Sequence, residues 1–341
     1  MAKVLVTGGC GYIGSHTLVD LIENAYDVIS VDSLINSDLS SLKGIKQITG
    51  ITVKNYAYDL CDLNLTRSIF EDNPDIKSII HFAALKSVNE SVEKPYLYFK
   101  NNINSLINLL FCCENYGVEN FIFSSSCTVY GNPDELPVSE NSPLKEAESP
   151  YGKTKQISEK LIEKATNDFG LKAISLRYFN PAGAHDSILI GESPLNTAAN
   201  LVPVITETAI GKRKKMTIYG KNYSTRDGTN IRDYIHVMDL ANGHTKALRH
   251  IDSNHFDKQY DVFNLGIGNG VSVLEAVNAF IKVSGLDLNY AFGERREGDV
   301  IAIYANFNKA KKILGWIPSK NIEDIMATAW AWEQRRVRSI K

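Results

Sequence analysis

Tyr151 and Lys155 are the two residues whose types and spacing most directly suggest chemistry. They are four positions apart in the run YGKTK, so on a helix they share one face, one turn apart. A free phenol has a pKa of about 10 and is a poor base at neutral pH. A neighbouring ammonium stabilises the phenolate and lowers that pKa, which suits acid–base chemistry at an alcohol. This spacing also arises by chance on many helices, so it needs support from elsewhere in the chain.

An apolar segment that ends in hydroxyl residues precedes this pair. The run 121–131 reads FIFSSSCTVYG, and we expect a strand over 120–124. In open parallel sheets, ligands bind outside the carboxyl ends of the strands. A serine at this position can share a hydrogen bond with a substrate hydroxyl, or it can merely cap a turn.

A glycine-rich turn lies near the start of the chain. In VLVTGGCGYIG at 4–14, Gly8, Gly11 and Gly14 recur every three residues, and Gly9, Gly11 and Gly14 form G-x-G-x-x-G. We expect a strand at 3–7 and a helix at 16–24 on either side of the turn. Glycine permits the tight turn and lets the backbone approach a pyrophosphate. The N-terminus of the helix then offers free N–H groups to the phosphates.

Two aspartates indicate which dinucleotide this turn would bind. Asp32 ends the next expected strand, 28–31, where a carboxylate can accept hydrogen bonds from both ribose hydroxyls. A 2′-phosphate there would be repelled, and no arginine lies between Gly8 and Asp32, so NAD is favoured over NADP. Asp59 follows 55–58, where a third strand would end, and could contact the adenine.

Short apolar strands alternate with helices through the first half of the chain. Further strands are expected at 78–82 and 173–178, and further helices at 102–114 and 152–169. This alternation predicts an α/β fold, a doubly wound parallel (Rossmann) sheet. Long polar loops at 180–200 and 220–230 mark the point where the alternation of strands and helices changes. We therefore expect an NAD-binding domain at 1–180, to which residues 231–265 return, and a smaller mixed α/β substrate domain at 181–341.

Composition excludes several partners. The 341 residues carry 37 Lys+Arg against 39 Asp+Glu, a net charge of −2, which argues against a nucleic-acid or membrane surface. The five cysteines and seven histidines show no metal-binding spacing, so we expect no metal. No apolar run approaches the ~18 residues of a membrane span, and no leader pattern follows Met1. We expect a cytoplasmic protein.

These motifs together resemble the extended short-chain dehydrogenase/reductase superfamily and, within it, the UDP-glucose 4-epimerase family. The resemblance extends from about residue 3 to residue 333. Besides the glycine turn, the serine segment and the Tyr151/Lys155 pair, four runs carry it. They are HFAALKSV at 81–88, LRYFNPAGAH at 176–185, RDYIHVMDLA at 232–241 and RREGD at 295–299.

The resemblance implies roles for individual residues. Tyr151 would be the catalytic base and acid, Ser126 the assisting hydroxyl, and Lys155 would tune Tyr151 and bind the nicotinamide ribose. The implied cofactor-binding residues are Gly8, Gly11, Tyr12, Ile13, Gly14, Asp32, Asn36, Ser37, Asp59, Leu60, Phe82, Ala83, Ala84, Lys86, Asn101, Ser124, Tyr151, Lys155 and Tyr178. The implied substrate-binding residues are Lys86, Ser126, Thr128, Tyr151, Phe179, Asn180, Asn200, Leu201, Tyr219, Arg232, Arg296, Asp299 and Ile303.

The implied reaction is the interconversion of UDP-galactose and UDP-glucose through a transient 4-keto sugar, with tightly bound NAD and a homodimeric enzyme. Four residues after Asp299 stands Ile303, where enzymes restricted to plain hexoses are expected to carry tyrosine and those that accept N-acetylhexosamines a small residue. Isoleucine is intermediate in size. A 4-epimerase of UDP-N-acetylhexosamines or UDP-uronic acids, or a bifunctional enzyme, therefore stays open as an alternative.

Two further readings of the sequence have less support. Nucleotide-sugar 4,6-dehydratases are expected to carry an acidic pair just after the strand-end serine, where this chain has Cys127 and Thr128. A non-catalytic NAD-binding regulatory protein would be expected to have lost Tyr151 or Lys155, and both are present.

Overall fold

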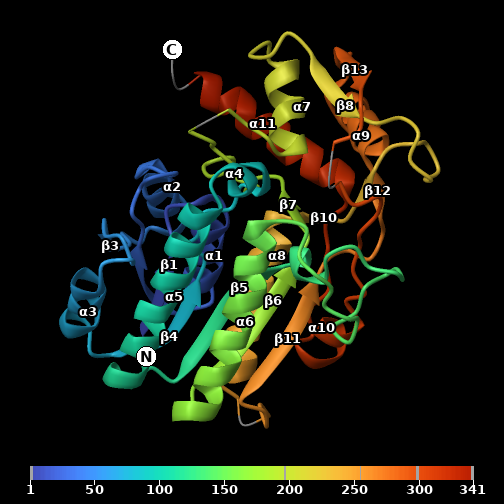
Figure 1. Ribbon diagram of the computed structural model, residues 1–341. Coiled ribbons are helices and arrows are strands. Elements are labelled where there is room, and N and C mark those ends of the chain that lie inside the picture. The colour runs from blue at the N-terminus through green and yellow to red at the C-terminus, as the bar shows by residue number, and fades with distance from the viewer. Residues whose placement is uncertain (1–2, 196, 254, 297–298, 339–341) are drawn as a thin grey trace.

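The computed structural model describes residues 3–195, 197–253, 255–296 and 299–338. Its centre is a seven-stranded parallel sheet with the order β11-β6-β5-β4-β1-β2-β3 (Figure 1). The strands are β1 (Lys3–Thr7), β2 (Asp27–Val31), β3 (Asn55–Tyr56), β4 (Ile76–His81), β5 (Asn120–Ser126), β6 (Lys172–Tyr178) and β11 (Tyr260–Leu265). The order reverses between β1 and β4, and ligands of such sheets bind at this switch point. The predicted doubly wound α/β fold is confirmed.

Helices cover both faces of this sheet. The helices on one face are α1 (Tyr12–Glu23), α2 (Ser40–Thr49) and α8 (Val237–Ile251). Those on the other face are α3 (Leu63–Asp72), α5 (Pro95–Tyr116) and α6 (Pro150–Phe169). Successive strand residues point to opposite faces, so Val4 and Val6 pack under the first group while Leu5 packs under the second. This explains why the strands are apolar at nearly every position.

A smaller unit lies above the carboxyl edge of the sheet (Figure 1). Its helices are α7 (Leu201–Ala209), α9 (Val273–Ser284) and α11 (Ile322–Arg338). Its strands form three short pairs: β7 (Asn180–Ala182) with β10 (Tyr234–His236), β8 (Met216–Tyr219) with β13 (Tyr290–Gly293), and β9 (Ile231–Arg232) with β12 (Val271–Ser272). A separate apolar cluster that includes Ile205, Phe280 and Met326 forms its core.

Several boundaries differ from the sequence prediction. Helix α1 begins at Tyr12 rather than at 16, because Gly11 is its N-cap and Gly14 already belongs to the first turn. Helix α5 begins at Pro95, a residue suited to a first helical turn. The short helix α10 (Asn308–Ile313) and Trp316 pack on the core of the first domain, although they lie in the range expected for the second.

Two more short helices follow strands of the main sheet. They are the helix α4 (Val88–Glu93) and the 3₁₀ helix η1 (Cys127–Tyr130), which follows β5 directly. Among the described residues, no helix has both the length and the apolar composition that crossing a membrane would require.

Candidate active site

The glycine turn joins β1 to α1 and is packed closely against other segments of the backbone. Gly8 has a φ of +69°, and a Cβ there would lie 3.0 Å from the backbone nitrogen of Ala83. A Cβ on Gly14 would lie 2.2 Å from the carbonyl oxygen of Gly8, so a side chain cannot be accommodated. No side chain caps the first turn of α1, and that turn contains no acidic residue. Its N–H groups therefore fit a pyrophosphate.

Asp32 lies at the carboxyl end of β2 with its carboxylate held in place. Oδ2 accepts a hydrogen bond from the backbone N–H of Cys10 at 3.1 Å. Oδ1 accepts from the N–H of Leu34 at 2.9 Å and from the hydroxyl of Ser37 at 2.7 Å. Oδ1 thus uses both of its lone pairs, whereas Oδ2 has one lone pair left that can accept a ribose hydroxyl of NAD. The predicted cofactor residue Asn36 lies in the same loop and is exposed.

A second part of the predicted cofactor site lies beyond β3. Asp59 is exposed, and its Oδ1 accepts from the N–H of Cys61 at 2.9 Å. The side-chain amide of Asn101 on α5 reaches the same cysteine, with Nδ2 3.8 Å from Sγ. Leu60, which lies between Asp59 and Cys61 in the sequence, is buried in the core. Segments 59–61 and 100–101 therefore form one wall, as an adenine site would need.

The segment after β4 completes the cofactor side. The N–H groups of Phe82 and Ala83 both lie 3.1 Å from the hydroxyl oxygen of Thr7. That hydroxyl also forms a buried 2.7 Å hydrogen bond with Nδ1 of His81. Thr7 and His81 thus fix the segment that leads to Ala84 and Lys86. Neither was predicted as a functional residue, although both lie at strand ends beside the glycine turn.

The predicted catalytic side chains meet at the carboxyl end of β5. Tyr151 lies in the first turn of α6, where the phenol faces the hydroxyl of Ser126. Lys155 is buried, and its Nζ donates to the carbonyl oxygen of Ser124 at 2.6 Å. Tyr178, at the end of β6, is paired with Ser126 across the two strands. Because β5 extends through Ser126, all three serines are held by the sheet.

Electrostatics at the Tyr151/Lys155 pair differ from the sequence prediction. Burial raises the pKa of the Tyr151 phenol to about 12, although the Ser126 hydroxyl acts to lower it. Burial lowers the pKa of Lys155 to about 7, and the carboxylate of Glu159 opposes this effect. The expected net lowering of the phenol pKa is thus absent in the protein alone, because both groups are desolvated. An added cation near the pair would favour the phenolate.

Two further features of the candidate site are a pair of buried oxygen atoms that lack hydrogen-bond partners and a cluster of apolar side chains. Thr128 Oγ1 and Asn180 Oδ1 are buried oxygen atoms with no hydrogen-bond partner among the described residues. Such atoms are unfavourable unless a ligand or water satisfies them. Beside them, Phe179 and Ile303 are buried in an apolar cluster that includes Cys127. Burial raises the pKa of the Cys127 thiol to about 12, so it cannot replace a carboxylic acid.

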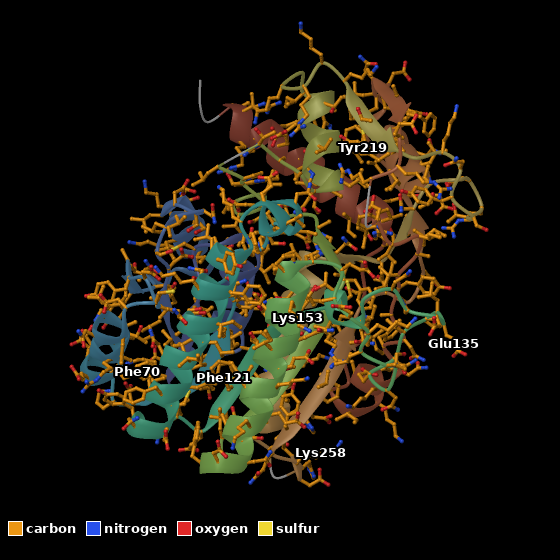
Figure 2. The ribbon with its side chains drawn as sticks, in the orientation of Figure 1. Phe70, Phe121, Glu135, Lys153, Tyr219 and Lys258 are labelled. Carbon is orange, nitrogen blue, oxygen red and sulfur yellow. The ribbon has the colours of Figure 1, made fainter. Side chains whose placement is uncertain are left out.

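Two predicted arginines come from the smaller unit. Arg232 is half-buried, and its guanidinium lies 3.4 Å from Asp299 Oδ1 and 2.6 Å from the carbonyl oxygen of Val300. Arg296 is exposed, and its guanidinium lies 3.9 Å from the centroid of the Tyr219 ring. Figure 2 shows Tyr219 in this unit, on β8. Glu297 and Gly298 of the RREGD run lie outside the described residues.

Glu192 is a residue of the candidate site that sequence reasoning missed. Its Oε1 accepts from Nδ2 of Asn200 at 2.9 Å and lies 3.6 Å from Nζ of Lys86. Trp332 of α11 donates from Nε1 to the backbone carbonyl of Glu192 at 2.8 Å. Leu201 begins α7 next to Asn200. Glu192 therefore joins residues predicted for the cofactor and for the substrate, and only a long loop marked it in the sequence.

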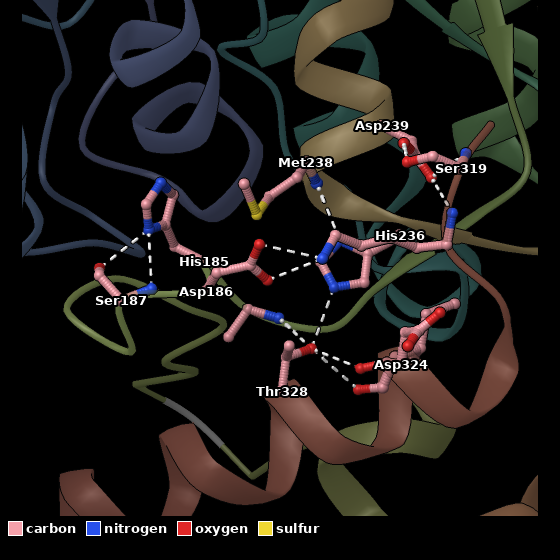
Figure 3. Close-up of polar contacts among 12 residues, drawn as sticks. His185, Asp186, Ser187, His236, Met238, Asp239, Ser319, Asp324 and Thr328 are labelled. Carbon is pink, nitrogen blue, oxygen red and sulfur yellow. Dashed lines mark hydrogen bonds and ion pairs between the residues drawn. The ribbon is translucent and has the colours of Figure 1, made fainter. Parts of the chain in front are cut away.

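The polar network in Figure 3 holds the smaller unit against the sheet. His236 Nε2 lies 3.0 Å from Thr328 Oγ1, which accepts from the N–H of Ala184 at 3.1 Å. Ser319 donates from its hydroxyl to Asp239 Oδ1 at 2.7 Å. These bonds fix α11 and the segment after β7 relative to α8. The site is therefore built from both units at a defined spacing.

Comparison with known proteins agrees with this geometry. The chain matches the family described as GDP-mannose 4,6 dehydratase over residues 5–329. It is 44% identical to the UDP-glucose 4-epimerase of Bacillus subtilis over 339 residues, covering 99% of this chain and 98% of that protein. The crystal structure of UDP-glucose 4-epimerase from Bifidobacterium longum in complex with NAD+ and UDP matches with a TM-score of 0.94 and 44% identity, covering 98% of this chain and 99% of that one.

A UDP-Glc/GlcNAc 4-epimerase from Campylobacter jejuni is also similar, with a TM-score of 0.84 and 36% identity over 98% of this chain and 100% of that one. The fold and the Ser–Tyr–Lys site define an extended short-chain dehydrogenase/reductase. Within that class, the chain belongs to the UDP-glucose 4-epimerase family, as its sequence motifs predicted.

Proposed function

We propose that the protein interconverts UDP-galactose and UDP-glucose by inverting C4 of the hexose, with NAD as its bound cofactor. The observation that carries the proposal is the Tyr151 phenol facing Ser126 at the carboxyl edge of β5, with Lys155 one turn along α6. The relative from Bifidobacterium longum was solved with NAD+ and UDP, which supports both ligand classes.

In this proposal, Tyr151 moves the proton of the C4 hydroxyl. When bound, NAD supplies the acceptor and donor of the C4 hydride. The Tyr151 phenolate takes the proton from O4 while Ser126 hydrogen-bonds that oxygen, and C4 becomes a carbonyl carbon. After the keto sugar turns, Tyr151 returns the proton to O4 with the opposite configuration at C4. Because burial raises the phenol pKa to about 12, the positive charge of Lys155 is needed beside it.

A turning hexose requires that UDP be held firmly while the sugar is held loosely. Arg232 and Arg296 are suited to the diphosphate, because guanidinium groups pair with two phosphate oxygens at once. The unpartnered oxygen atoms of Thr128 and Asn180 are available to substrate hydroxyl and amide donors. The salt bridge of Arg232 to Asp299, 3.4 Å long, orients one of these cations.

The alternative substrate class, UDP-N-acetylhexosamines, depends on Ile303. Its side chain is only 6% exposed and packs in the cluster with Cys127 and Phe179. This wall is smaller than a tyrosine would make it, which favours some acceptance of a 2-acetamido group. The similarity to the UDP-Glc/GlcNAc 4-epimerase supports the same possibility. Although the chain matches the family described as GDP-mannose 4,6 dehydratase, Cys127 and Thr128 provide no acid for a dehydration, which argues against a dehydratase activity.

The test is to incubate the purified protein separately with UDP-galactose and with UDP-N-acetylgalactosamine and to separate the products by chromatography. We expect UDP-glucose from the first and a slower conversion of the second. Conversion of the N-acetyl substrate alone would replace the main proposal by its alternative. Bound NAD without conversion of either substrate would support a non-catalytic, regulatory protein.

We also infer the two binding domains and the homodimer that the sequence predicted. Residues 1–180 and 231–265 would bind NAD, and residues 181–341 would bind the UDP-sugar. Strand β11 supports this division because it completes the main sheet.

A cytoplasmic homodimer is supported by the free cysteines of the described chain and by exposed Ile107 and Phe111, one turn apart on α5. Light scattering that reports a monomer at micromolar concentration would contradict the dimer.

A further inference from the structure

Helix α6 places three side chains against the serines of β5 on three successive turns. Tyr151, Lys155 and Glu159 are four residues apart, so they share one helix face. Lys155 Nζ donates to the carbonyl oxygen of Ser124 at 2.6 Å, and the hydroxyl of Ser125 donates to Glu159 Oε1 at 2.5 Å. The end of β5 therefore binds α6 at Glu159 as well as at the predicted catalytic pair.

The carboxylate of Glu159 is fixed as a buried anion. Arg177 on β6 donates from Nε to Oε1 at 2.9 Å and from an Nη to Oε2 at 2.6 Å, in a bidentate pair. The two side chains are 5% and 6% exposed. Removing one partner of such a pair leaves the other buried and uncompensated. Glu159 is thus held in one position with its charge retained.

Glu159 supplies the negative charge near the Lys155 ammonium. The titratable or charged groups around Lys155 are Tyr151 and Glu159 on α6, His81 on β4, and Tyr178 and Arg177 on β6, the last of which is the cation paired with Glu159. Burial lowers the pKa of His81 to about 3, so this side chain is neutral. Burial holds the pKa of Tyr178 well above its ordinary value, so this phenol is neutral too. The Glu159 carboxylate, which pairs with Arg177, acts to raise the pKa of Lys155.

We propose that Glu159 is a positioning residue of the catalytic pair: its carboxylate, held by Arg177 and Ser125, keeps the Lys155 ammonium charged and aligned one turn from Tyr151. This role rests on the proposed epimerase function. Among the described residues, the Glu159 carboxylate bonds to Ser125 and Arg177 beneath the catalytic pair, so its effect on the reaction passes through Lys155.

The test is the pH dependence of kcat for Glu159→Gln with UDP-galactose. Glutamine keeps an oxygen for Ser125 and Arg177 but lacks the charge, so the desolvation of Lys155 is no longer opposed. Lys155 then loses its proton at lower pH, and the phenolate of Tyr151 loses its cation. We expect the alkaline limb of the profile to move down by about one pH unit or more. An unshifted profile would overturn the proposal.

A double variant separates this charge effect from simple loss of the ion pair. Glu159→Gln leaves Arg177 buried without an anion, whereas Glu159→Gln with Arg177→Met removes both charges together. Replacing a whole buried pair is often neutral for stability. We expect the double variant to recover thermal stability but to keep part of the shift of the pH profile, because it also removes the Arg177 cation paired with Glu159. Recovery of the wild-type profile as well would show that the pair is merely structural.

A control variant and the wild-type protein complete the experiment. Glu163 lies one turn further along α6 and is exposed, so Glu163→Gln should keep the wild-type profile. If the wild-type protein converts no UDP-sugar, the proposed function itself fails. If it does, and only the Glu159 variants behave like the control, the function stands and the role of Glu159 is refuted.

Discussion

The hydroxyl of Tyr12 donates a 2.6 Å hydrogen bond to the backbone carbonyl of Gly183, 171 residues further along the chain. Tyr12 begins α1 directly after the glycine turn, and Gly183 follows β7 in the segment that leads to the smaller unit. A single bond therefore links the cofactor-binding turn to the segment that leads to the predicted substrate residues. The predicted cofactor-binding and substrate-binding segments are therefore connected at this point.

Tyr12→Phe tests this connection. Loss of one hydrogen bond should reduce the free energy of unfolding by about 1 kcal/mol and loosen the segment after β7. We expect KM for UDP-galactose to rise more than kcat falls, measured by steady-state kinetics. Tyr96→Phe is the matched control, since Tyr96 is 86% exposed. Identical kinetics for the two variants would contradict a linking role.

Tyr151→Phe tests the proposed base. The phenyl ring fills the same space but cannot accept the proton of the C4 hydroxyl. We expect kcat to fall by about 10²–10⁴-fold or more, while UDP binding measured by calorimetry stays within a few-fold of wild type. A variant that retained most of its activity would exclude Tyr151 as the acid–base group.

Asp32→Ser tests the choice of dinucleotide. Removing the carboxylate removes both the ribose acceptor and the repulsion of a 2′-phosphate. We expect NAD affinity to fall about 10- to 100-fold, as for lost hydrogen bonds to a charged group, and discrimination against NADP to shrink, measured by cofactor titration. Asp27→Ser, at the exposed amino end of the same strand, should leave both affinities unchanged.

Ile303→Ala tests the apolar wall of the sugar site. Truncation of this buried side chain should cost about 2–5 kcal/mol of stability and enlarge the space beside Cys127. We expect the rate ratio of UDP-N-acetylgalactosamine to UDP-galactose to rise. Ile303→Val, expected to cost only about 0.5–1.5 kcal/mol, is the control and should change the ratio little. An unchanged ratio in the alanine variant would separate Ile303 from the 2-substituent.

Buried histidines predict how stability depends on pH. Burial lowers the pKa of His16 and His81 to about 3 and of His236 and His244 to about 4. The unfolded chain takes up these protons below a pH of about 6.5, whereas the folded protein does not. The free energy of unfolding should therefore fall as pH drops from about 6.5 towards 4, measured by urea denaturation.

His244→Gln provides the matched comparison for this pH dependence. It should reduce the slope of stability against pH by about one proton in that interval. His255→Gln, at an exposed position, should leave the slope unchanged. Equal slopes for the two variants would show that His244 does not resist protonation in the folded protein.

The sequence by itself determined the doubly wound sheet, the glycine turn with Asp32, and the Tyr151/Lys155 pair. These features are local: strand apolarity, the requirement for glycine at Gly8 and Gly14, and the four-residue helix spacing all act within a few residues. Element ends were predicted less well. The start of α1 was missed because the N-cap is a glycine, which leaves no side-chain signal.

Only the tertiary structure decided which distant groups share a charge environment. The pairing of Glu192 with Lys86 and Asn200, and of Glu159 with Arg177, joins segments from different elements that no spacing rule relates. The pKa values of Tyr151 and Lys155 likewise depend on burial, which exists only in the folded chain. Desolvation and pairwise electrostatics are properties of three-dimensional packing, so the sequence could name candidate catalytic residues but not their protonation behaviour.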